Sequence, residues 1–477
     1  MLFNSIDFAV FLPIVFAGYW FAFKSVGARN LFLLAASYVF YGWWDPRFLG
    51  LIALSSGIDY MVALALDGEA RAGRRKALLW LSIGANLGML GAFKYYNFFA
   101  ANVEEAFSLL GKPLALPHLD VVLPVGISFY TFQTMSYTID VYRRQMHPER
   151  DPVAFLSYVS FFPQLVAGPI ERAISLLPQF KVAKSFDRAL AVDGLRQMLW
   201  GLFKKVVVAD NCASFADVIF DAPGEHTGST LLVGALLFTF QIYCDFSGYS
   251  DIAIGCARLF GFELMRNFAV PYFSRDIAEF WRRWHISLST WFRDYVYIPL
   301  GGSRGSALNR IRNTMIIFVL SGFWHGANWT FICWGALNAA FFIPLLVADR
   351  NRRNLDTVAQ GALLPSLREA WGMATTFLLT VLAWIFFRAE TMDAALTHIG
   401  GILSPTLFTV PTVRPFDVFA IILFLVAAEW ASRTLRHPLE LLNRVPSRSV
   451  RWAVYYGLLA GIIAFGGKEQ EFIYFQF

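Results

Sequence analysis

Charged residues are scarce in this chain of 477 residues. Asp, Glu, Lys and Arg make up 16% of it, against about 25% in soluble globular proteins, whereas hydrophobic residues make up 57%. A deficit of charge over so long a chain excludes an ordinary soluble protein. Apolar runs recur along the chain, and several reach the roughly 20 residues that a helix needs to cross the hydrocarbon. The composition therefore predicts an integral membrane protein.

Cysteine pairs and the signature motifs of several enzyme classes are also absent. The four cysteines are widely spaced and form no Cys-x-x-Cys pair, so we expect neither a disulfide framework nor a metal site. The sequence has no Walker-type Gly-Lys-Ser/Thr, no dinucleotide-binding Gly-x-Gly-x-x-Gly in a βαβ setting and no His-Glu-x-x-His. The glycine-rich loop 301–305 predicts a tight turn, where Arg304 can attract an anionic ligand together with Arg310 and Arg312.

Basic residues gather in short loops, at 71–76 and at 350–353. Such loops usually stay on the cytoplasmic side of a membrane; solvated charge without topological meaning is the alternative. The first residues carry neither a basic region nor a cleavage site, so the apolar run 8–23 predicts a retained first span. Three spans before the loop at 71–76 would place the N-terminus outside.

The apolar segments predict an all-α, polytopic membrane protein with roughly 10 to 13 membrane elements. Many segments contain Pro or Gly, as at Pro124, Pro163 and Gly322. Non-helical backbone at membrane depth survives only when it is buried in protein or lines a wet cavity. Broken or re-entrant helices around a cavity are therefore expected. No connection is long enough for a soluble domain, so residues 1–477 are interpreted as one domain.

His325 is the most unusual polar residue, because it lies inside an apolar element, in Ser-Gly-Phe-Trp-His-Gly-Ala-Asn-Trp (321–329). An ionisable side chain in such a place is costly and indicates a functional site. Gly322 and Gly326 leave bare backbone beside it, which permits either a ligand or a second helix to approach closely. Trp324 and Asn328 are candidate substrate-binding neighbours.

His285 lies at the border of an aromatic and a cationic face. At helical spacing Trp281, Trp284 and Leu288 share an apolar face, and Arg282 and His285 share an adjacent polar stripe. Either an interfacial amphipathic helix or a functional site explains this pattern. Six of the 15 tryptophans fall within 281–334, so they bracket both unusual histidines, which makes Trp284 and Arg282 further candidates for substrate binding.

The other five histidines lie in polar or proline-containing connections or after an amphipathic stretch, and are expected to be exposed: His118, His147, His226, His398 and His437.

A further group of polar residues within an apolar stretch, here called the polar island, occupies residues 241–255. Asp245 and Asp251 are six positions apart, about 240° around a regular helix, so they should not act as a carboxylate pair. Hydrogen bonds to hydroxyl groups or to arginines such as Arg258 are expected. A role of the two aspartates in substrate binding stays open.

These motifs resemble the membrane-bound O-acyltransferase family, in particular its branch that acts on bacterial polysaccharides such as alginate. The resembling stretches cover almost the whole chain: 124–133, 160–170, 245–251, 282–288, 293–302, 322–327 and the terminal Phe-Ile-Tyr-Phe-Gln-Phe at 472–477. The resemblance implies a helical fold around a central tunnel. It also implies that His325 is the essential catalytic residue and that His285 is the second histidine of the family.

The resemblance further implies acetyl-coenzyme A as the donor, a polysaccharide acceptor, periplasmic acetyltransferase partners and a place in the bacterial cytoplasmic (inner) membrane, surrounded by lipid. Imidazole suits removal of a hydroxyl proton near neutral pH, so His325 is the expected general base. His285, Asn328 or backbone N–H groups near Gly326 are candidates to stabilise the oxyanion. Transfer of another acyl group, such as D-alanine, and export of a polysaccharide are the alternatives.

Overall fold

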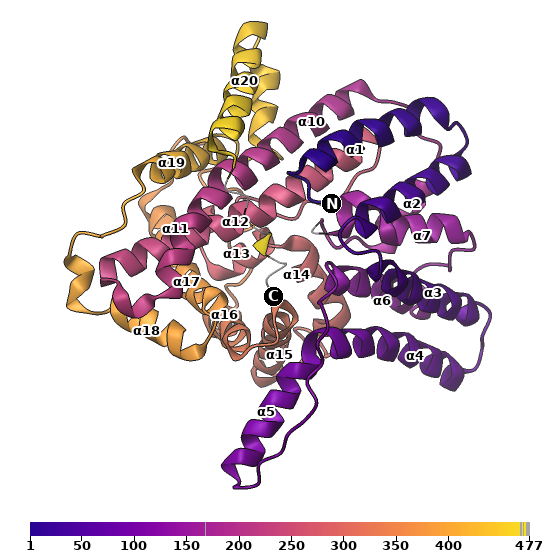
Figure 1. Ribbon diagram of the computed structural model, residues 1–477, viewed down its shortest axis with the longest axis horizontal. Helices are drawn as coiled ribbons and strands as arrows, with labels where there is room; N and C mark the ends of the chain where they lie inside the picture. The colour runs from indigo at the N-terminus through magenta and orange to yellow at the C-terminus, as the bar shows by residue number, and fades with distance from the viewer. Residues whose placement is uncertain (167, 468–469, 471, 474–477) are drawn as a thin grey trace. The chain divides into compact units, whose positions relative to one another are not determined.

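The computed structural model describes residues 1–166, 168–467, 470, 472 and 473. In this part of the chain every regular element is a helix (Figure 1), which confirms the all-α prediction. The chain forms two compact units: unit 1 comprises Met1–Gly194 and Cys256–Leu264, and unit 2 comprises Leu195–Gly255 and Met265–Phe477. The single domain predicted for 1–477 stays a prediction. Ala167 and residues 474–477, parts of two of the resembling stretches, lie outside the described residues.

Unit 1 contains nine α-helices and the start of a tenth within the described residues: α1 (Ile6–Ala17), α2 (Val26–Gly42), α3 (Phe48–Leu66), α4 (Ala72–Leu90), α5 (Tyr96–Leu109), α6 (Ile127–Tyr142), α7 (Pro152–Ser160), α8 (Phe162–Leu165), α9 (Ala173–Leu176) and α10 (Arg188–Leu202). Short π or 3-10 segments lie at Gly18–Ala22, Gly91–Tyr95 and Leu177–Phe180.

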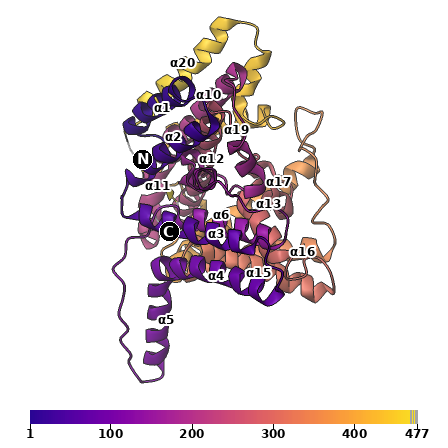
Figure 2. The ribbon, with the colours of Figure 1, turned by 90° about the vertical axis from the view of Figure 1, so that its right-hand side faces the viewer.

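The core of unit 1 is built around α6, which packs against α3 and α4 (Figure 2). Polar groups inside this core satisfy one another: the Asp59 carboxylate accepts hydrogen bonds from Asn86 Nδ2 at 2.8 Å, from Thr138 Oγ1 at 3.0 Å and from Ser82. Buried polar groups are tolerated only when they are paired in this way. Gly126, with φ +74°, directly precedes α6, so the break predicted near Pro124 is present.

Unit 2 continues with the end of α10 and contains the remaining helices: α11 (Asp210–Asp221), α12 (Gly228–Leu259, the last turn in unit 1), α13 (Ile277–Arg283), α14 (Ile286–Phe292), α15 (Ala307–His325), α16 (Trp329–Val347), α17 (Leu367–Arg388), α18 (Met392–Ile402), α19 (Phe416–Ala431) and α20 (Arg448–Phe465). Its π or 3-10 segments lie at Phe203–Ala209, Pro223–Glu225, Pro271–Phe273, Arg293–Tyr297, Pro405–Phe408 and Pro438–Arg444.

The helices α15 and α16 form a close antiparallel pair in unit 2, and α17 packs on α16 (Figure 1). Glycines allow the close approach of α15 and α16. A Cβ on Gly322 would overlap the Phe331 carbonyl, and one on Gly335 would overlap the Phe318 carbonyl. Of the two explanations for the bare backbone around His325, helix packing is therefore the one that the structure supports.

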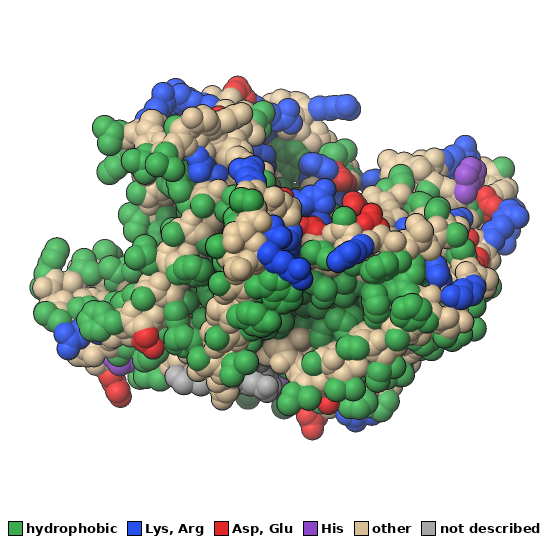
Figure 3. Space-filling model, turned by 90° about the horizontal axis from the view of Figure 1, so that it is seen from above, with side chains coloured by type: hydrophobic (Ala, Val, Ile, Leu, Met, Phe, Trp, Pro, Cys, Tyr) green, Lys and Arg blue, Asp and Glu red, His purple; other side chains and the backbone are tan. Residues whose placement is uncertain are grey.

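In the part of the chain that the structure describes, five helices have the length and apolar composition to cross a membrane: Phe48–Leu66, Ala72–Leu109, Gly228–Leu259, Trp329–Val347 and Leu367–Arg388. Large apolar side chains lie on their surfaces; on α17, Leu367 is 91% and Trp371 is 77% exposed. Figure 3 shows hydrophobic side chains over much of the face that it draws. Such extensive exposure of large apolar side chains is typical of contact with lipid. The larger number of 10 to 13 membrane elements stays a prediction.

Candidate active site

His325 is the last residue of α15 and lies in an aromatic cage. The helix ends there because Gly326, with φ −160° and ψ 148°, leaves the helical conformation. The imidazole is 5% exposed. Its ring centroid lies 4.9 Å from that of Trp324, 5.2 Å from Trp334 on α16 and 5.2 Å from Phe387 on α17. Three helices thus fix the position of one ionisable ring in an apolar pocket.

His285 faces His325 from a sharp break in the chain. The regular helical spacing assumed from Trp281 to Leu288 is interrupted here, because α13 ends at Arg283 and α14 begins at Ile286. His285 adopts φ +42° and ψ 56°, a left-handed conformation that is rare outside glycine. Its ring centroid lies 6.5 Å from that of His325, with the ring planes at 89°. The two histidines that stood out in the sequence are therefore brought together.

A backbone hydrogen bond defines the tautomer of His285. The Leu288 N–H donates to His285 Nδ1 over 3.2 Å, so the proton of the neutral ring must lie on Nε2. His285 is 1% exposed and lies outside the candidate membrane-spanning helices, and burial lowers its pKa to about 3. The ring is therefore neutral near pH 7, and its Nε2–H is a hydrogen-bond donor.

The low pKa of His285 predicts how a variant depends on pH. From about pH 5 to about pH 8 the charge of His285 should not change, since its pKa lies near 3. The ratio of kcat/KM between wild type and His285→Gln should therefore stay constant across this range. A ratio that changes through the usual pKa range of histidine, near 6.5, would contradict a neutral His285.

The tryptophans form a continuous wall beside the two histidines. Trp334 and Trp384 stack with centroids 5.6 Å apart and planes at 18°. Trp284 lies 4.9 Å from Trp384, and Trp281 lies 5.7 Å from Trp334. Trp324 is 6.2 Å from His285. The predicted aromatic neighbourhood is present; a role of Trp284 and Trp324 in binding substrate stays a prediction.

A cavity of about 640 Å³ lies beside this wall, within unit 2. Its lining includes Trp281, which contacts Trp334, and Ser321, which precedes His325 by one turn of α15. Three arginines also line it: Arg282, Arg293 and Arg352. The cavity combines a wide apolar wall with cationic groups, so it is suited to an amphipathic anion.

The comparisons with known proteins identify the family of the chain. The model of the family described as MBOAT, membrane-bound O-acyltransferase, matches residues 118–391, a range that includes both histidines. The chain belongs to the membrane-bound O-acyltransferase family. It is thus a multi-pass membrane protein and an O-acyltransferase, as the motifs and the apolar helices indicated.

Three relatives show how far the similarity of this O-acyltransferase extends. A protein of Azotobacter vinelandii named "probable alginate O-acetylase" is 43% identical over 83% of this chain and 76% of its own length. The peptidoglycan O-acetyltransferase of Helicobacter pylori is 38% identical over 84% of this chain and 80% of its own. The teichoic acid D-alanyltransferase of Streptococcus thermophilus is 28% identical over 56% of this chain and 69% of its own.

The polar candidates of this acyltransferase are largely engaged with backbone. Asn328 caps α16, because its Oδ1 accepts from Thr330 N–H at 3.0 Å, and its Nδ2 donates to the Glu390 carbonyl at 2.8 Å. The Arg282 guanidinium donates to the Asn351 and Asn354 carbonyls, both at 2.7 Å. Arg304 is exposed in its loop. Contact of any of them with a substrate stays a prediction.

The two aspartates of the polar island pair with lysines. Lys205 Nζ lies 2.8 Å from Asp245 and 2.9 Å from Asp210, and Lys204 Nζ lies 2.6 Å from Asp251. The separate partners confirm that Asp245 and Asp251 do not form a carboxylate pair. The expected arginine partner was wrong: Arg258 pairs with Asp193 in unit 1, at 2.6 Å. Two adjacent lysines inside the apolar run 191–209 were the sequence signal that could have identified the true partners.

Replacing Lys205 with methionine should destabilise the fold. The lysine side chain is 1% exposed, so its loss leaves two buried carboxylates without their cation, at an expected cost of about 3 kcal/mol or more. Thermal unfolding in detergent should show a lower Tm, whereas Lys112→Met, at an exposed site, should leave Tm unchanged. An unaltered Tm in Lys205→Met would show that the ion pairs of Lys205 with Asp210 and Asp245 contribute little to stability.

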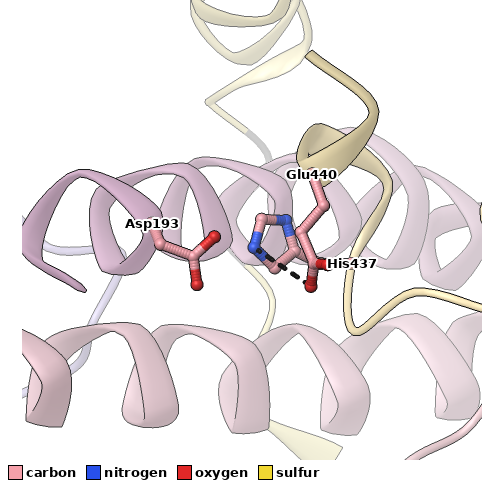
Figure 4. A group of neighbouring side chains, drawn as sticks. All are labelled: Asp193, His437 and Glu440. Atoms are coloured by element: carbon pink, nitrogen blue, oxygen red, sulfur yellow. Dashed lines mark ion pairs between the residues drawn. The ribbon is translucent and has the colours of Figure 1, made fainter. Parts of the chain in front are cut away.

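Two of the histidines expected to be exposed are buried. His398 in α18 is 1% exposed, stacks on Phe220 with centroids 4.3 Å apart, and has Nε2 3.0 Å from the Leu231 carbonyl. His437 is 2% exposed, and its Nε2 lies 3.9 Å from Glu440 (Figure 4). Tertiary packing, which the polar sequence around them does not reveal, buries both. Asp193, which Figure 4 also draws, belongs to unit 1.

Proposed function

We propose that this O-acyltransferase moves an acetyl group from cytoplasmic acetyl-coenzyme A to a hydroxyl of an exopolysaccharide, or to a periplasmic acetyltransferase that completes the transfer. The cytoplasmic (inner) membrane of a bacterium is the proposed location. The observation that carries the proposal is that the rings of His325 and His285 lie close together, with centroids 6.5 Å apart, next to the cluster of tryptophans. The relatives named as O-acetylating enzymes support acetyl as the group.

In this mechanism His325 acts as the general base. It removes the proton of the acceptor hydroxyl, whose oxygen attacks the thioester carbonyl carbon. The tetrahedral intermediate then collapses, the C–S bond breaks, and the leaving thiolate takes up the proton from His325. A positioned base contributes roughly 100- to 10,000-fold in rate, and the cage of Trp324, Trp334 and Phe387 keeps the imidazole in place.

His285 is the preferred group for stabilising the oxyanion. Its Nε2–H is a neutral donor whose orientation is fixed by the Leu288 bond, and such a preorganised donor is worth about 100- to 1,000-fold in rate. The other candidates are less suitable. The Asn328 amide caps α16, and the Gly326 N–H already donates to the Gly322 carbonyl at 3.4 Å.

The donor is proposed to occupy the 640 Å³ cavity. Its phosphates would meet the guanidinium groups of Arg282, Arg293 and Arg352, with Arg304 attracting the anion from the exposed loop.

Arg352→Gln should raise KM for acetyl-coenzyme A about 10-fold, because one charge-assisted hydrogen bond is worth about 1.5–3 kcal/mol, and should leave kcat nearly unchanged. Arg353→Gln is the matched control, since Arg353 is equally exposed but does not line the cavity. Equal KM values for both variants would place the donor elsewhere.

Transfer of D-alanine is the second candidate, because a teichoic acid D-alanyltransferase is 28% identical to the chain. It requires a different acyl donor, so membranes incubated with labelled acetyl-coenzyme A or with labelled D-alanine on its carrier separate the two.

A cell-based test separates transfer from polysaccharide export: His325→Ala should give secreted polymer that lacks acetyl groups. Loss of secretion, with the residual polymer still acetylated, would contradict the proposed function.

A further inference from the structure

Asn267 binds the chain on the C-terminal side of His285. It lies between α12 and α13 and is fully buried. Its carbonyl accepts from Ile286 N–H at 2.9 Å, and its Oδ1 accepts from Ser287 Oγ at 2.9 Å and from Ser287 N–H at 3.3 Å. One residue thus makes three hydrogen bonds to the two positions that directly follow His285.

The same segment also holds the chain on the N-terminal side of His285. The Ala269 N–H donates to the Arg283 carbonyl at 2.9 Å. Residues 283 to 287 are therefore fixed at both ends by the segment 267–269. The break between α13 and α14, which the helical spacing did not predict, coincides with these bonds.

The polar island of α12 supports this arrangement from the other side. Asn267 Nδ2 donates to Ser250 Oγ at 3.1 Å. Phe246, one helical turn before Ser250, packs on the His285 ring with centroids 4.6 Å apart. The helix α12 therefore holds the ring of His285 through Phe246 and its backbone through Ser250 and Asn267. The lysine pairs of Asp245 and Asp251 lie on the same helix.

The backbone of His285 needs such support. A non-glycine residue at φ +42° persists only where the surrounding structure enforces it. Without the two hydrogen bonds that the Asn267 side chain accepts from Ser287, the chain at 284–286 would relax toward a conformation of lower energy, and the imidazole would move away from His325. Displacement of a catalytic group by about 1 Å can lower a rate about 100-fold.

We infer that Asn267 is a positioning residue: together with Ser250, it holds His285 in the left-handed conformation that presents its imidazole to His325 during acyl transfer. The inference rests on the proposed function for its effect on rate, and on the hydrogen bonds alone for its effect on the conformation of His285. The polar island of α12 thereby acquires a role as support for the active site.

The kinetic test uses the full-length protein in detergent with labelled acetyl-coenzyme A. Asn267→Ala should lower kcat about 100-fold and leave KM for the donor unchanged. The matched control is Asn211→Ala, which removes a buried asparagine of the same unit whose amide donates to the Val206 and Val207 carbonyls. It should keep wild-type kcat. If Asn267→Ala does not fold, Ser287→Ala removes only one of the bonds and should give a smaller loss of kcat.

A double-mutant cycle decides whether Asn267 acts through His285. In a His285→Ala background, Asn267→Ala should cause no further loss of kcat, because the group that it positions is gone. A further loss of about 100-fold would overturn the inference and indicate a general structural role.

A spectroscopic test does not depend on catalysis. In protein labelled with ¹⁵N-histidine, the signal that disappears in His285→Gln should show the Nε2–H tautomer in wild type and should change in Asn267→Ala but not in Asn211→Ala. An unaltered signal in Asn267→Ala would overturn the inference. If wild type transfers no acetyl group, the proposed function fails, and this measurement still decides the role of Asn267.

Discussion

Replacing His325 with glutamine should lower kcat of acyl transfer by about 100- to 10,000-fold. Glutamine keeps a polar side chain in the cage of Trp324, Trp334 and Phe387 but cannot accept the hydroxyl proton. KM for the donor should change little, because the arginines that line the cavity are untouched. A radiometric transfer assay with purified protein measures both constants.

The control for this variant is His398→Gln. His398 is also buried in unit 2, but it contacts Phe220 and the Leu231 carbonyl and neither His285 nor His325. Its replacement should leave kcat nearly unchanged, because its partners are Phe220 and the Leu231 carbonyl and not the two histidines. If both variants lost activity to the same extent, the effect at His325 would reflect damage to the fold rather than loss of a base.

Replacing Gly322 with valine should prevent α15 and α16 from packing. Even a Cβ at this position would overlap the Phe331 carbonyl and lie 3.3 Å from Gly335 N. Backbone cannot move aside as a side chain can, so the expected cost exceeds the roughly 1–3 kcal/mol of ordinary overpacking. The thermal midpoint in detergent should fall sharply. Activity should be lost with it, since α16 carries Trp334 against His325.

The matched control is Gly461→Ala in α20. No atom outside its own helix turn lies within 4 Å of the Cβ that would be added there, so the substitution should leave Tm unchanged or raise it, as expected for Gly→Ala in a helix. A Gly322→Val protein as stable as wild type would show that α15 and α16 can separate freely.

The membrane character, and the two histidines that the structure brings together, could be singled out from the sequence, because a charge deficit and a polar residue within an apolar or aromatic stretch are local signals. His285 shows where local reasoning ends. Regular helical spacing placed it on a polar stripe, yet the helix is broken beside it, where Ser287 donates hydrogen bonds to Asn267, 18 positions before His285. Spacing carries no information on such distant partners.

Burial was predicted less well for the same physical reason. His398 and His437 lie among polar residues in sequence and are buried by segments far along the chain. The partners of Asp245 and Asp251 were expected to be hydroxyl groups or arginines and proved to include Lys205 and Lys204. From the sequence, the glycines beside His325 could allow either a ligand or a second helix to approach closely. Only the position of Phe331, which packs against both glycines, decides for the helix.

The most direct test of the proposed acetyl transfer is incubation of the purified protein with labelled acetyl-coenzyme A and a polysaccharide acceptor, with and without a periplasmic acetyltransferase partner. Wild type should transfer the label, to the polymer alone or only when the partner is present, and His325→Gln should transfer about 100-fold less or lower still. Absence of transfer by wild type under both conditions, or equal transfer by His325→Gln, would contradict acetyl transfer with His325 as the general base.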